Sequence, residues 1–294
     1  MKIATKLLRW YRRLGRDLPW RNTRNPYHIL VSEVMLQQTQ VDRVKLFYNR
    51  WLKQFPNWKR LAQASNKEII HAWAGLGYNR RVLALRHIAQ KISEHGVPKT
   101  YEEWLILKGI GPYTASAISA FAQKKRILPI DTNIRRVLGR ILLGKPFSDP
   151  ADDKKIQKYT NTFLPLRGAY YDVPQALFDL ASITCTKTPN CGQCPLRQNC
   201  KSSKLFLSGT VHIPKRTIVA SKEHKHRNKS YPDRIYRGRI LKVVREKSEV
   251  SIQKIGYAID KTFDPKLDQS WVQSMIQRLS KEGFTKQKKG KISL

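Results

Sequence analysis

The stretch LKGIGPYTASAI, residues 107–118, decides the fold of the chain. Gly109 and Gly111 flank Ile110, and helical segments are expected on both sides of this short turn. Glycine permits a tight turn and lets backbone N–H groups approach a phosphate without obstruction by a side chain. The stretch therefore has a helix-hairpin-helix pattern, which would contact a nucleic-acid backbone and position the protein without reading sequence.

A second motif lies shortly downstream, LPIDTNIRRVLGR at residues 128–140. It places Asp131 at the start of a helix, where a carboxylate can also cap the first turn. A glycine turn alone is common between helices, and this combination makes the pattern informative. Around both motifs, residues 1–200 show apolar residues at helical spacing, separated by Gly and Pro. This organisation predicts a compact all-α domain.

The chain has four cysteines, all in one short run, C-x5-C-x2-C-x5-C, at Cys185, Cys191, Cys194 and Cys200. In a cytosolic protein such a cluster indicates a metal site more than disulfides. Four thiolates suit zinc or an iron–sulfur cluster. A zinc ribbon normally has two C-x2-C knuckles, and only one is present here. The single compact run therefore favours a [4Fe–4S] cluster.

Charge is the strongest compositional signal. The 294 residues include 57 Lys and Arg against 21 Asp and Glu, a net charge of +36. A charge this unbalanced predicts a polyanionic partner, and nucleic acid fits best. No apolar run approaches the roughly 20 residues of a transmembrane helix. We therefore expect a monomeric cytoplasmic protein that is associated with the nucleoid and has no membrane partner.

The composition changes after Cys200. We expect a helix-hairpin-helix domain at residues 1–206 with the cysteine loop at 185–200, and a linker at 207–232. From Asp233 three helical patterns precede a hairpin with Lys289-Gly290 near its turn. That order predicts a small winged-helix-like basic domain at residues 233–294, which would contact nucleic acid. A solvated basic tail and a protein-docking module are the alternatives for this segment.

Five motifs together carry a resemblance to a known family: SEVMLQQTQV (32–41), GLGYNRRVLAL (75–85), GIGPYTASAI (109–118), IDTNIRRVL (130–138) and QALFDLASITC (175–185). Over about residues 5–205 the chain resembles the endonuclease III-like helix-hairpin-helix DNA glycosylases, and among them the adenine-specific mismatch glycosylases. The resemblance implies base excision repair of double-stranded DNA that contains a mismatch. Adenine opposite 8-oxoguanine or guanine would be flipped out and its N-glycosidic bond hydrolysed. It also implies a [4Fe–4S] cluster on the four cysteines.

The same resemblance assigns the chemistry. Glu33 would be the general acid, since protonating the departing purine requires a carboxylic acid with a raised pKa. Asp131 would stabilise the oxocarbenium-like sugar, as in the two-carboxylate logic of glycoside hydrolysis. Asn133 would orient Asp131 or the attacking water. Tyr113 stands where lyase-competent relatives have a lysine, and a phenol cannot form a Schiff base. The reaction would therefore stop at an abasic site, although Lys108 and Lys124 leave weak lyase activity open.

Contacts to DNA follow from the same motifs. Gln38 matches the residue that is inserted into the duplex beside the lesion, and Tyr78 matches an aromatic wedge. Gln37 follows Glu33 by four residues, so we expect both on one helical face. The hairpin glycines Gly109 and Gly111 also match the family. Trp20, Arg21 and Asp179 match residues that surround the flipped adenine. Alternatively, Trp20 could be a core residue and Asp179 part of a structural salt bridge.

The chain departs from the family pattern at three places. The first cysteine gap is one residue shorter than usual, and Asn79 stands where a second tyrosine is common. The segment after the linker is too short for the usual C-terminal domain, which resembles Nudix-type hydrolases. Two other functions compete with adenine excision. A thymine glycosylase acting on G·T mismatches is the nearer one, and a non-catalytic DNA-binding protein is the more distant.

Overall fold

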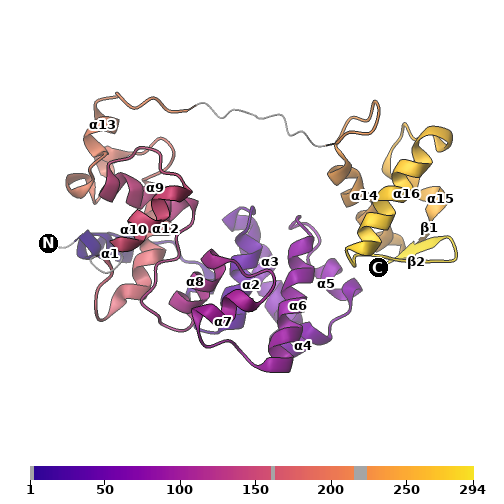
Figure 1. The fold of residues 1–294 in the computed structure, drawn as a ribbon, viewed down its shortest axis with the longest axis horizontal. Helices are drawn as coiled ribbons and strands as arrows, with labels where there is room; N and C mark the ends of the chain where they lie inside the picture. Colours follow the sequence, from indigo (N-terminus) through magenta and orange to yellow (C-terminus); the bar gives the residue numbers. More distant parts are fainter. Residues whose placement is uncertain (1–2, 160–162, 215–223) are drawn as a thin grey trace. The chain divides into compact units, whose positions relative to one another are not determined.

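The computed structural model describes residues 3–159, 163–214 and 224–294 (Figure 1). The chain folds into two compact units. The first consists of Met1–Asn49 and Glu94–Arg216, and the second of Arg50–Ser93 and Thr217–Leu294. None of the described helices is long and apolar enough to cross a membrane.

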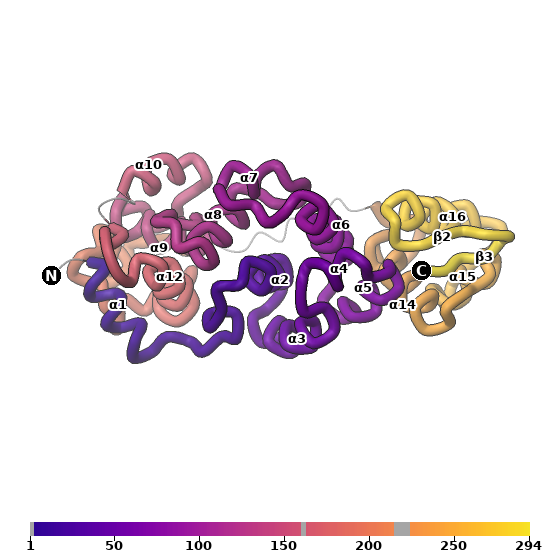
Figure 2. The backbone as a smooth tube through the Cα atoms, turned by 90° about the horizontal axis from the view of Figure 1, so that it is seen from below, coloured from indigo at the N-terminus to yellow at the C-terminus, as the bar shows by residue number. Residues whose placement is uncertain are grey.

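The first unit is helical, as predicted. Its elements are α1 (Ile3–Leu14), η1 (Pro19–Arg21), α2 (Pro26–Leu36), the start of α3 (Val41–Gln54), α7 (Tyr101–Ile106), α8 (Pro112–Phe121), α9 (Thr132–Leu138), η2 (Gly139–Leu143), η3 (Pro150–Asp152), α10 (Asp153–Lys158), η4 (Ala169–Tyr171), α12 (Asp172–Ile183), η5 (Cys191–Gln193), η6 (Arg197–Asn199) and α13 (Ser203–Leu207). An apolar cluster in this unit joins α1, α9 and α12, where Leu7, Val137 and Leu177 are fully buried. Figure 2 shows these three helices packed together.

The helical hairpin predicted from residues 107–118 is confirmed. Helix α7 begins after Thr100, whose side chain accepts a hydrogen bond from the Glu103 amide. Gly109 has φ 104°, a left-handed conformation that favours glycine. Gly111 then caps α8 without a side chain, and Pro112 opens the helix. The first turn of α8 thus has no side-chain cap on its backbone N–H groups, which an anion would need to reach.

The second unit contains two groups of elements. The first group is the end of α3 with α4 (Trp58–Gln63), α5 (Asn66–Ala72) and α6 (Arg80–His95). The second is α14 (Asp233–Lys247), β1 (Glu249–Ser251), α15 (Ile252–Ile259), α16 (Pro265–Lys281), β2 (Lys286–Lys288) and β3 (Lys291–Ser293). The first group packs around aromatic rings, with the centroids of Trp51 and Trp73 5.3 Å apart.

The C-terminal part of this unit has the three helices and the hairpin that the sequence predicts. The structure adds the strand β1, which gives an antiparallel sheet in the order β1-β3-β2. Ile292 of β3 is fully buried and pairs with Val250 on one side and Gln287 on the other. The hairpin turns at Lys289 and Gly290, with φ 48° and 70°, as a two-residue turn requires. Three helices with a small antiparallel sheet are the elements that the expected winged-helix-like domain requires.

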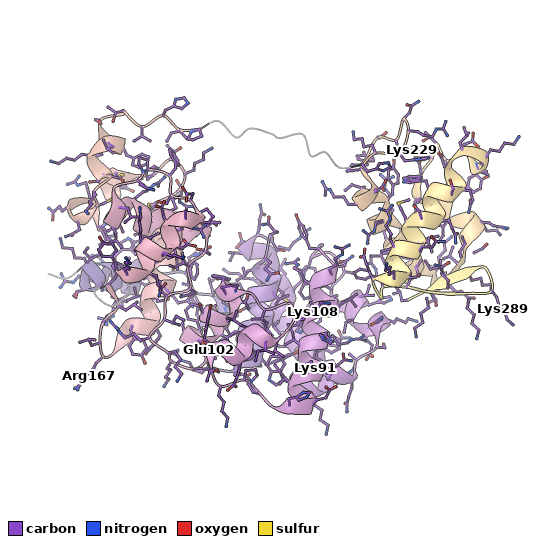
Figure 3. All side chains as sticks on the ribbon, in the orientation of Figure 1. Lys91, Glu102, Lys108, Arg167, Lys229 and Lys289 are labelled. Carbon is purple, nitrogen blue, oxygen red and sulfur yellow. The ribbon has the colours of Figure 1, made fainter. Side chains whose placement is uncertain are left out.

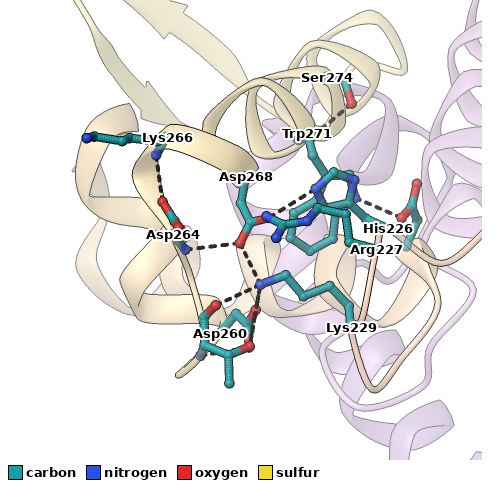
Figure 4. Close-up of polar contacts among 11 residues, drawn as sticks. His226, Arg227, Lys229, Asp260, Asp264, Lys266, Asp268, Trp271 and Ser274 are labelled. Atoms are coloured by element: carbon teal, nitrogen blue, oxygen red, sulfur yellow. Dashed lines mark hydrogen bonds and ion pairs between the residues drawn. The ribbon is translucent and has the colours of Figure 1, made fainter.

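A buried ammonium group ties the preceding segment to this fold. Lys229 Nζ lies 2.6 Å from Asp260 Oδ2 and 2.6 Å from Asp268 Oδ2, and it also donates to the Thr262 carbonyl (Figure 4). The His226 ring stacks on Trp271 with centroids 4.7 Å apart. His226 and Lys229, which belong to the expected linker 207–232, therefore contact α16 and the turn that follows α15. Residues 215–223 of that linker lie outside the described residues, and the expected domain boundaries stay a prediction.

Candidate active site

One cavity of about 390 Å³ in the first unit is lined by eight of the twelve residues predicted for catalysis and DNA binding. It is bounded by η1, by the end of α2 and the turn after it, by the N-terminal ends of α8 and α9, and by one face of α12. Its lining comprises Arg16, Leu18, Trp20, Arg21, Glu33, Leu36, Gln37, Gln38, Thr39, Val41, Tyr113, Asp131, Thr132, Asn133, Gln175, Phe178 and Ser182. Segments that are far apart in sequence thus bring two carboxylates into one pocket.

Glu33 lies on α2, a helix with most of its residues buried. Helix α2 begins at Pro26 after the Asn25 cap and buries eight of its eleven residues, Glu33 among them. Only 7% of Glu33 is exposed. This burial raises the pKa of Glu33 to about 7, although the hydroxyl of Tyr113, 2.8 Å from Oε2, lowers it, and Asp131 adds to the rise. A carboxyl group with this pKa can hold a proton near neutral pH and release it.

Asp131 meets a different environment. It is the N-cap of α9, and its Oδ1 accepts hydrogen bonds from the amides of Asn133 (2.9 Å) and Ile134 (2.7 Å). Its Oδ2 accepts a bond of 2.7 Å from Asn133 Nδ2. Burial raises the pKa of Asp131, and these three donors oppose the rise. Burial thus raises the pKa of both acids in the cavity, but Asp131 has three N–H donors that favour its carboxylate, whereas Glu33 has one hydroxyl donor.

Asn133, which donates to Asp131, in turn accepts a hydrogen bond from Arg136. Arg136 Nη2 donates to Asn133 Oδ1 at 3.2 Å and to the Ala181 carbonyl at 3.1 Å. Its Nε donates to the carbonyl of Cys185 at 2.9 Å. A chain of hydrogen bonds therefore runs from Asp131 through Asn133 and Arg136 to the first cysteine of the cysteine loop.

The glutamines occupy a turn, whereas we expected Gln37 to continue the helical face of Glu33. Helix α2 ends at Leu36, Gln37 is its C-cap, and α3 begins at Val41. Gln38 has φ 57°, a left-handed conformation that no helix can continue through. Both glutamines are exposed at the rim of the cavity, so their amides do not follow the helix geometry that the sequence suggested.

The three residues expected around the flipped adenine, Trp20, Arg21 and Asp179, do not all line the cavity. Trp20 and Arg21 line the cavity, and the Trp20 ring packs edge-on against Tyr48 at 5.5 Å. Asp179 is fully buried, does not line the cavity, and accepts hydrogen bonds of 2.7–2.8 Å from Arg16 and Arg21. The structure therefore gives Asp179 the structural ion pair that was its alternative, and it holds Arg21 toward the pocket.

Tyr78 lies in the second unit. It is 62% exposed and has φ 47°, directly after Gly77 at φ 75°. The Arg81 guanidinium lies 5.5 Å from the Tyr78 ring centroid, and the Arg81 amide donates to the Tyr78 carbonyl at 3.0 Å. A strained, exposed aromatic residue on a braced loop is consistent with the wedge that the resemblance assigns to this position.

The four cysteines line a common pocket with Arg140, which is nearly fully buried. Arg140 Nη1 lies 3.3 Å from Cys185 Sγ and donates to the Thr186 carbonyl at 2.6 Å. Backbone amides also donate to Cys194 and Cys200. Among the described residues no three His, Cys, Asp or Glu side chains are grouped to hold a single metal ion. The structure thus places the four cysteines around one small pocket that also has N–H donors.

Sequence reasoning did not identify the wall that α12 contributes. Gln175, Phe178 and Ser182 line the cavity, and Gln175 accepts a hydrogen bond of 2.9 Å from Arg21 Nε. These three residues and Asp179 recur at helical spacing, which is a signal that the sequence did contain. Arg16 has no local motif that would have indicated its place.

Comparisons with known proteins agree with this geometry. The family described as HhH-GPD superfamily base excision DNA repair protein matches residues 31–165. The chain is 39% identical over 197 residues to the adenine DNA glycosylase of Mycobacterium tuberculosis (strain CDC 1551 / Oshkosh), and the match covers 65% of each protein. It is 36% identical over 246 residues to the adenine DNA glycosylase of Mycolicibacterium smegmatis, covering 82% of this chain and 80% of that relative.

Solved structures share the fold. A thermostable thymine-DNA glycosylase superposes with a TM-score of 0.64 at 26% identity, covering 69% of this chain and 95% of that one. A trapped complex of endonuclease III with DNA superposes with a TM-score of 0.59 at 17% identity, with the same coverage. The expected endonuclease III-like helix-hairpin-helix fold is therefore confirmed.

Proposed function

Because the chain belongs to the HhH-GPD superfamily of base excision DNA repair proteins, we propose that it excises adenine that is mispaired with 8-oxoguanine or guanine in double-stranded DNA. The observation that carries the proposal is the pairing of Glu33, whose pKa is about 7, with the capped carboxylate of Asp131 in one cavity. The cavity, about 390 Å³, is of the size that ordinary small-molecule pockets have and could receive a flipped base.

Glu33 would protonate the purine as the N-glycosidic bond breaks. The bonding electron pair moves onto the adenine ring, and the proton from Glu33 at N7 neutralises the charge that develops there. Tyr113 keeps the Glu33 carboxyl group oriented through its 2.8 Å hydrogen bond. The raised pKa is the property that this step needs, since a carboxyl group of ordinary pKa would already be ionised.

Asp131 would stabilise the positive charge that forms at C1′. Its N–H donors favour the ionised form, and Asn133 fixes the orientation of the carboxylate. Water then adds to C1′, and the Glu33 carboxylate takes its proton, so the acid is regenerated. Tyr113 offers no amine to attack C1′, and the product would be an abasic site in an intact strand.

DNA would be held by the backbone amides at the start of α8, where Gly111 leaves open space for a phosphate. Gln38 and Tyr78 would occupy the duplex around the flipped base, because both are exposed and both adopt left-handed conformations on short loops. The enzyme would act as a monomer on nucleoid DNA in the cytoplasm.

The cysteines Cys185, Cys191, Cys194 and Cys200 would hold a [4Fe–4S] cluster. When bound, such a cluster supplies a rigid cross-link between the ends of the loop. Arg140 and Arg136 would transmit that rigidity to α9, since they bond to the sulfur and the carbonyl of Cys185. The protein's own contribution is thus to brace Asn133 and Asp131.

Thymine excision from G·T mismatches is the second candidate, because a thymine-DNA glycosylase is among the solved structures with this fold. The acid Glu33 favours adenine, since it stands in the pocket with its proton available for a purine nitrogen.

The experiment compares Glu33→Gln and Asp131→Asn with Glu102→Gln, an exposed carboxylate of α7 outside the cavity (Figure 3). Binding to an 8-oxoG·A duplex and single-turnover base release are measured for each. We expect both cavity variants to bind and to lose turnover, while Glu102→Gln keeps both. Equal turnover in all three variants would refute the proposed chemistry.

A further inference from the structure

The β2–β3 hairpin carries an unusual concentration of lysines. Four of its residues are exposed lysines, namely Lys286, Lys288, Lys289 and Lys291. The opposite face of the hairpin is directed to the fold, since Ile292 is fully buried and Gln287 Nε2 donates to Ser280 Oγ of α16 at 3.1 Å. The hairpin therefore has an inner face that packs and an outer face that is charged.

The strand register defines the outer face. Lys288 pairs directly with Lys291, and Lys286 pairs with Ser293. Cross-strand partners point to the same side of a sheet, and residues two apart in a strand do so too. Lys286, Lys288 and Lys291 thus share one face, and Lys289 extends from the turn beside them, away from the helices (Figure 3).

Folding gains little from this arrangement. Lys288 and Lys291 are like charges in directly opposite positions, which is destabilising. Lys289 occupies a left-handed position, φ 48°, that Asn, Asp or Gly would fill with less strain. One carboxylate lies nearby, Glu249 at 2.9 Å from Lys291 Nζ, and both side chains are more than half exposed, so the pair contributes little. The charges are better explained by a partner than by the fold.

We propose that this outer face, formed by Lys286, Lys288, Lys289 and Lys291 and called here the lysine face, binds the phosphodiester backbone of duplex DNA without reading its sequence. Lysine is a point charge on a flexible stem and suits phosphates of variable position. The carbonyl of Gly290 accepts a hydrogen bond of 3.0 Å from the Ile252 amide, which anchors the turn to α15. The choice of duplex DNA as the polyanion rests on the proposed function.

An acidic membrane surface is the competing polyanion. Stable binding to a membrane needs buried apolar or aromatic side chains in addition to charge. The lysine face offers none, because the apolar residue of the hairpin, Ile292, points inward. Duplex DNA needs only the charges, since counterion release supplies most of the affinity for its backbone.

The test measures the salt dependence of binding to an undamaged duplex. Each phosphate contact contributes about 0.9 to the slope of log K against log salt. Losing two contacts should therefore reduce the slope by about 1.8, which changes the relative affinity by about 12-fold between 50 and 200 mM salt. The hairpin variant is Lys288→Gln/Lys289→Asn, in which Asn suits the left-handed turn and the repulsion with Lys291 is removed. It should melt no lower than the wild type.

The matched control is Lys261→Gln/Lys266→Gln, which removes the same charge from exposed sites just after α15 and in the first turn of α16. Fluorescence anisotropy of a labelled duplex is recorded for the full-length wild type and both variants, with phosphatidylserine vesicles as a second partner. We expect a smaller slope of log K against log salt for the hairpin variant and an unchanged slope for the control. An unchanged slope, an equal loss in the control, or a loss confined to vesicles would overturn the proposal. If the double variant is unstable, the single variant Lys289→Asn replaces it, and its slope of log K against log salt should fall by about 0.9.

Adenine release at saturating protein separates this inference from the proposed function. The hairpin variant should release adenine from an 8-oxoG·A duplex at the wild-type single-turnover rate. If neither protein releases adenine while the slope still falls as expected, the proposed function fails and the lysine face stands.

Discussion

Replacing Glu33 by Gln should stabilise the protein at pH 8 and leave its stability almost unchanged at pH 4.5. Glu33 is 7% exposed and its folded-state pKa is about 7, against 4.5 for the free side chain. Gln has nearly the same shape, carries no charge and can still accept the hydrogen bond that Tyr113 donates. The substitution therefore removes the cost of burying a carboxylate and little else.

The size and sign follow from proton linkage. Below pH 4.5 the carboxyl group is protonated in both the folded and the unfolded chain, and it contributes no penalty. Between pH 4.5 and 7 the folded chain keeps a proton that the unfolded chain has lost, so the stability of the wild type falls as pH rises. Above pH 7 the penalty is complete. The difference between 4.5 and about 7 corresponds to about 3 kcal/mol.

The assay is urea unfolding of wild type and Glu33→Gln at matched cofactor content, from pH 4.5 to pH 8. Taking the difference between the two proteins cancels the titration of all other groups that the substitution leaves unchanged. The variant should gain about 3 kcal/mol relative to the wild type across this range. A difference that does not depend on pH, or a variant that is less stable at pH 8, would refute the raised pKa and with it the role of Glu33 as an acid.

Three further results are expected. The single-turnover rate of adenine release by the wild type should fall about tenfold per pH unit above pH 7, as Glu33 loses its proton, whereas a flat pH–rate profile would exclude it as the acid. Asp131→Asn keeps an oxygen that can accept the Ile134 amide, so its melting temperature should stay close to the wild type while base release falls about 10²–10³-fold; a collapse of stability would make Asp131 chiefly a cap. The ion pair of Arg80 with Glu282, at 2.6 Å and 72% and 20% exposed, should give a coupling below about 1 kcal/mol in a double-alanine cycle of thermal unfolding, and a larger value would mark it as a structural anchor.

The fold was predictable where the signal is local. The turn at Gly109 and Gly111 and the hairpin at Lys289-Gly290 depend on a few residues with unusual backbone needs, and both were found. Strand β1 was not predicted, because three residues, Glu249–Ser251, are too few to show alternation. Its pairing with β3 depends on residues about forty positions away, which no window of sequence contains.

The site was predictable only in part, for the same reason. The resemblance pointed to Glu33, Tyr113 and Asp131, and the structure brings them together from three elements. Helical spacing did not reveal that α2 ends before Gln37, because the left-handed residue that follows, Gln38, is neither a glycine nor a proline. The ion pairs of Asp179 with Arg16 and Arg21 span more than 150 positions, so only the packing of α12 reveals them.

The central claim is that this chain hydrolyses the N-glycosidic bond of mispaired adenine and leaves the strand intact. The most direct test is single-turnover base release from matched duplexes containing 8-oxoG·A, G·A, G·T and T·A, with the abasic product scored with and without alkali. The account predicts adenine release that is fastest from 8-oxoG·A, with strand breaks only after alkali. Thymine release from G·T, or tight binding with no release from any duplex, would contradict it.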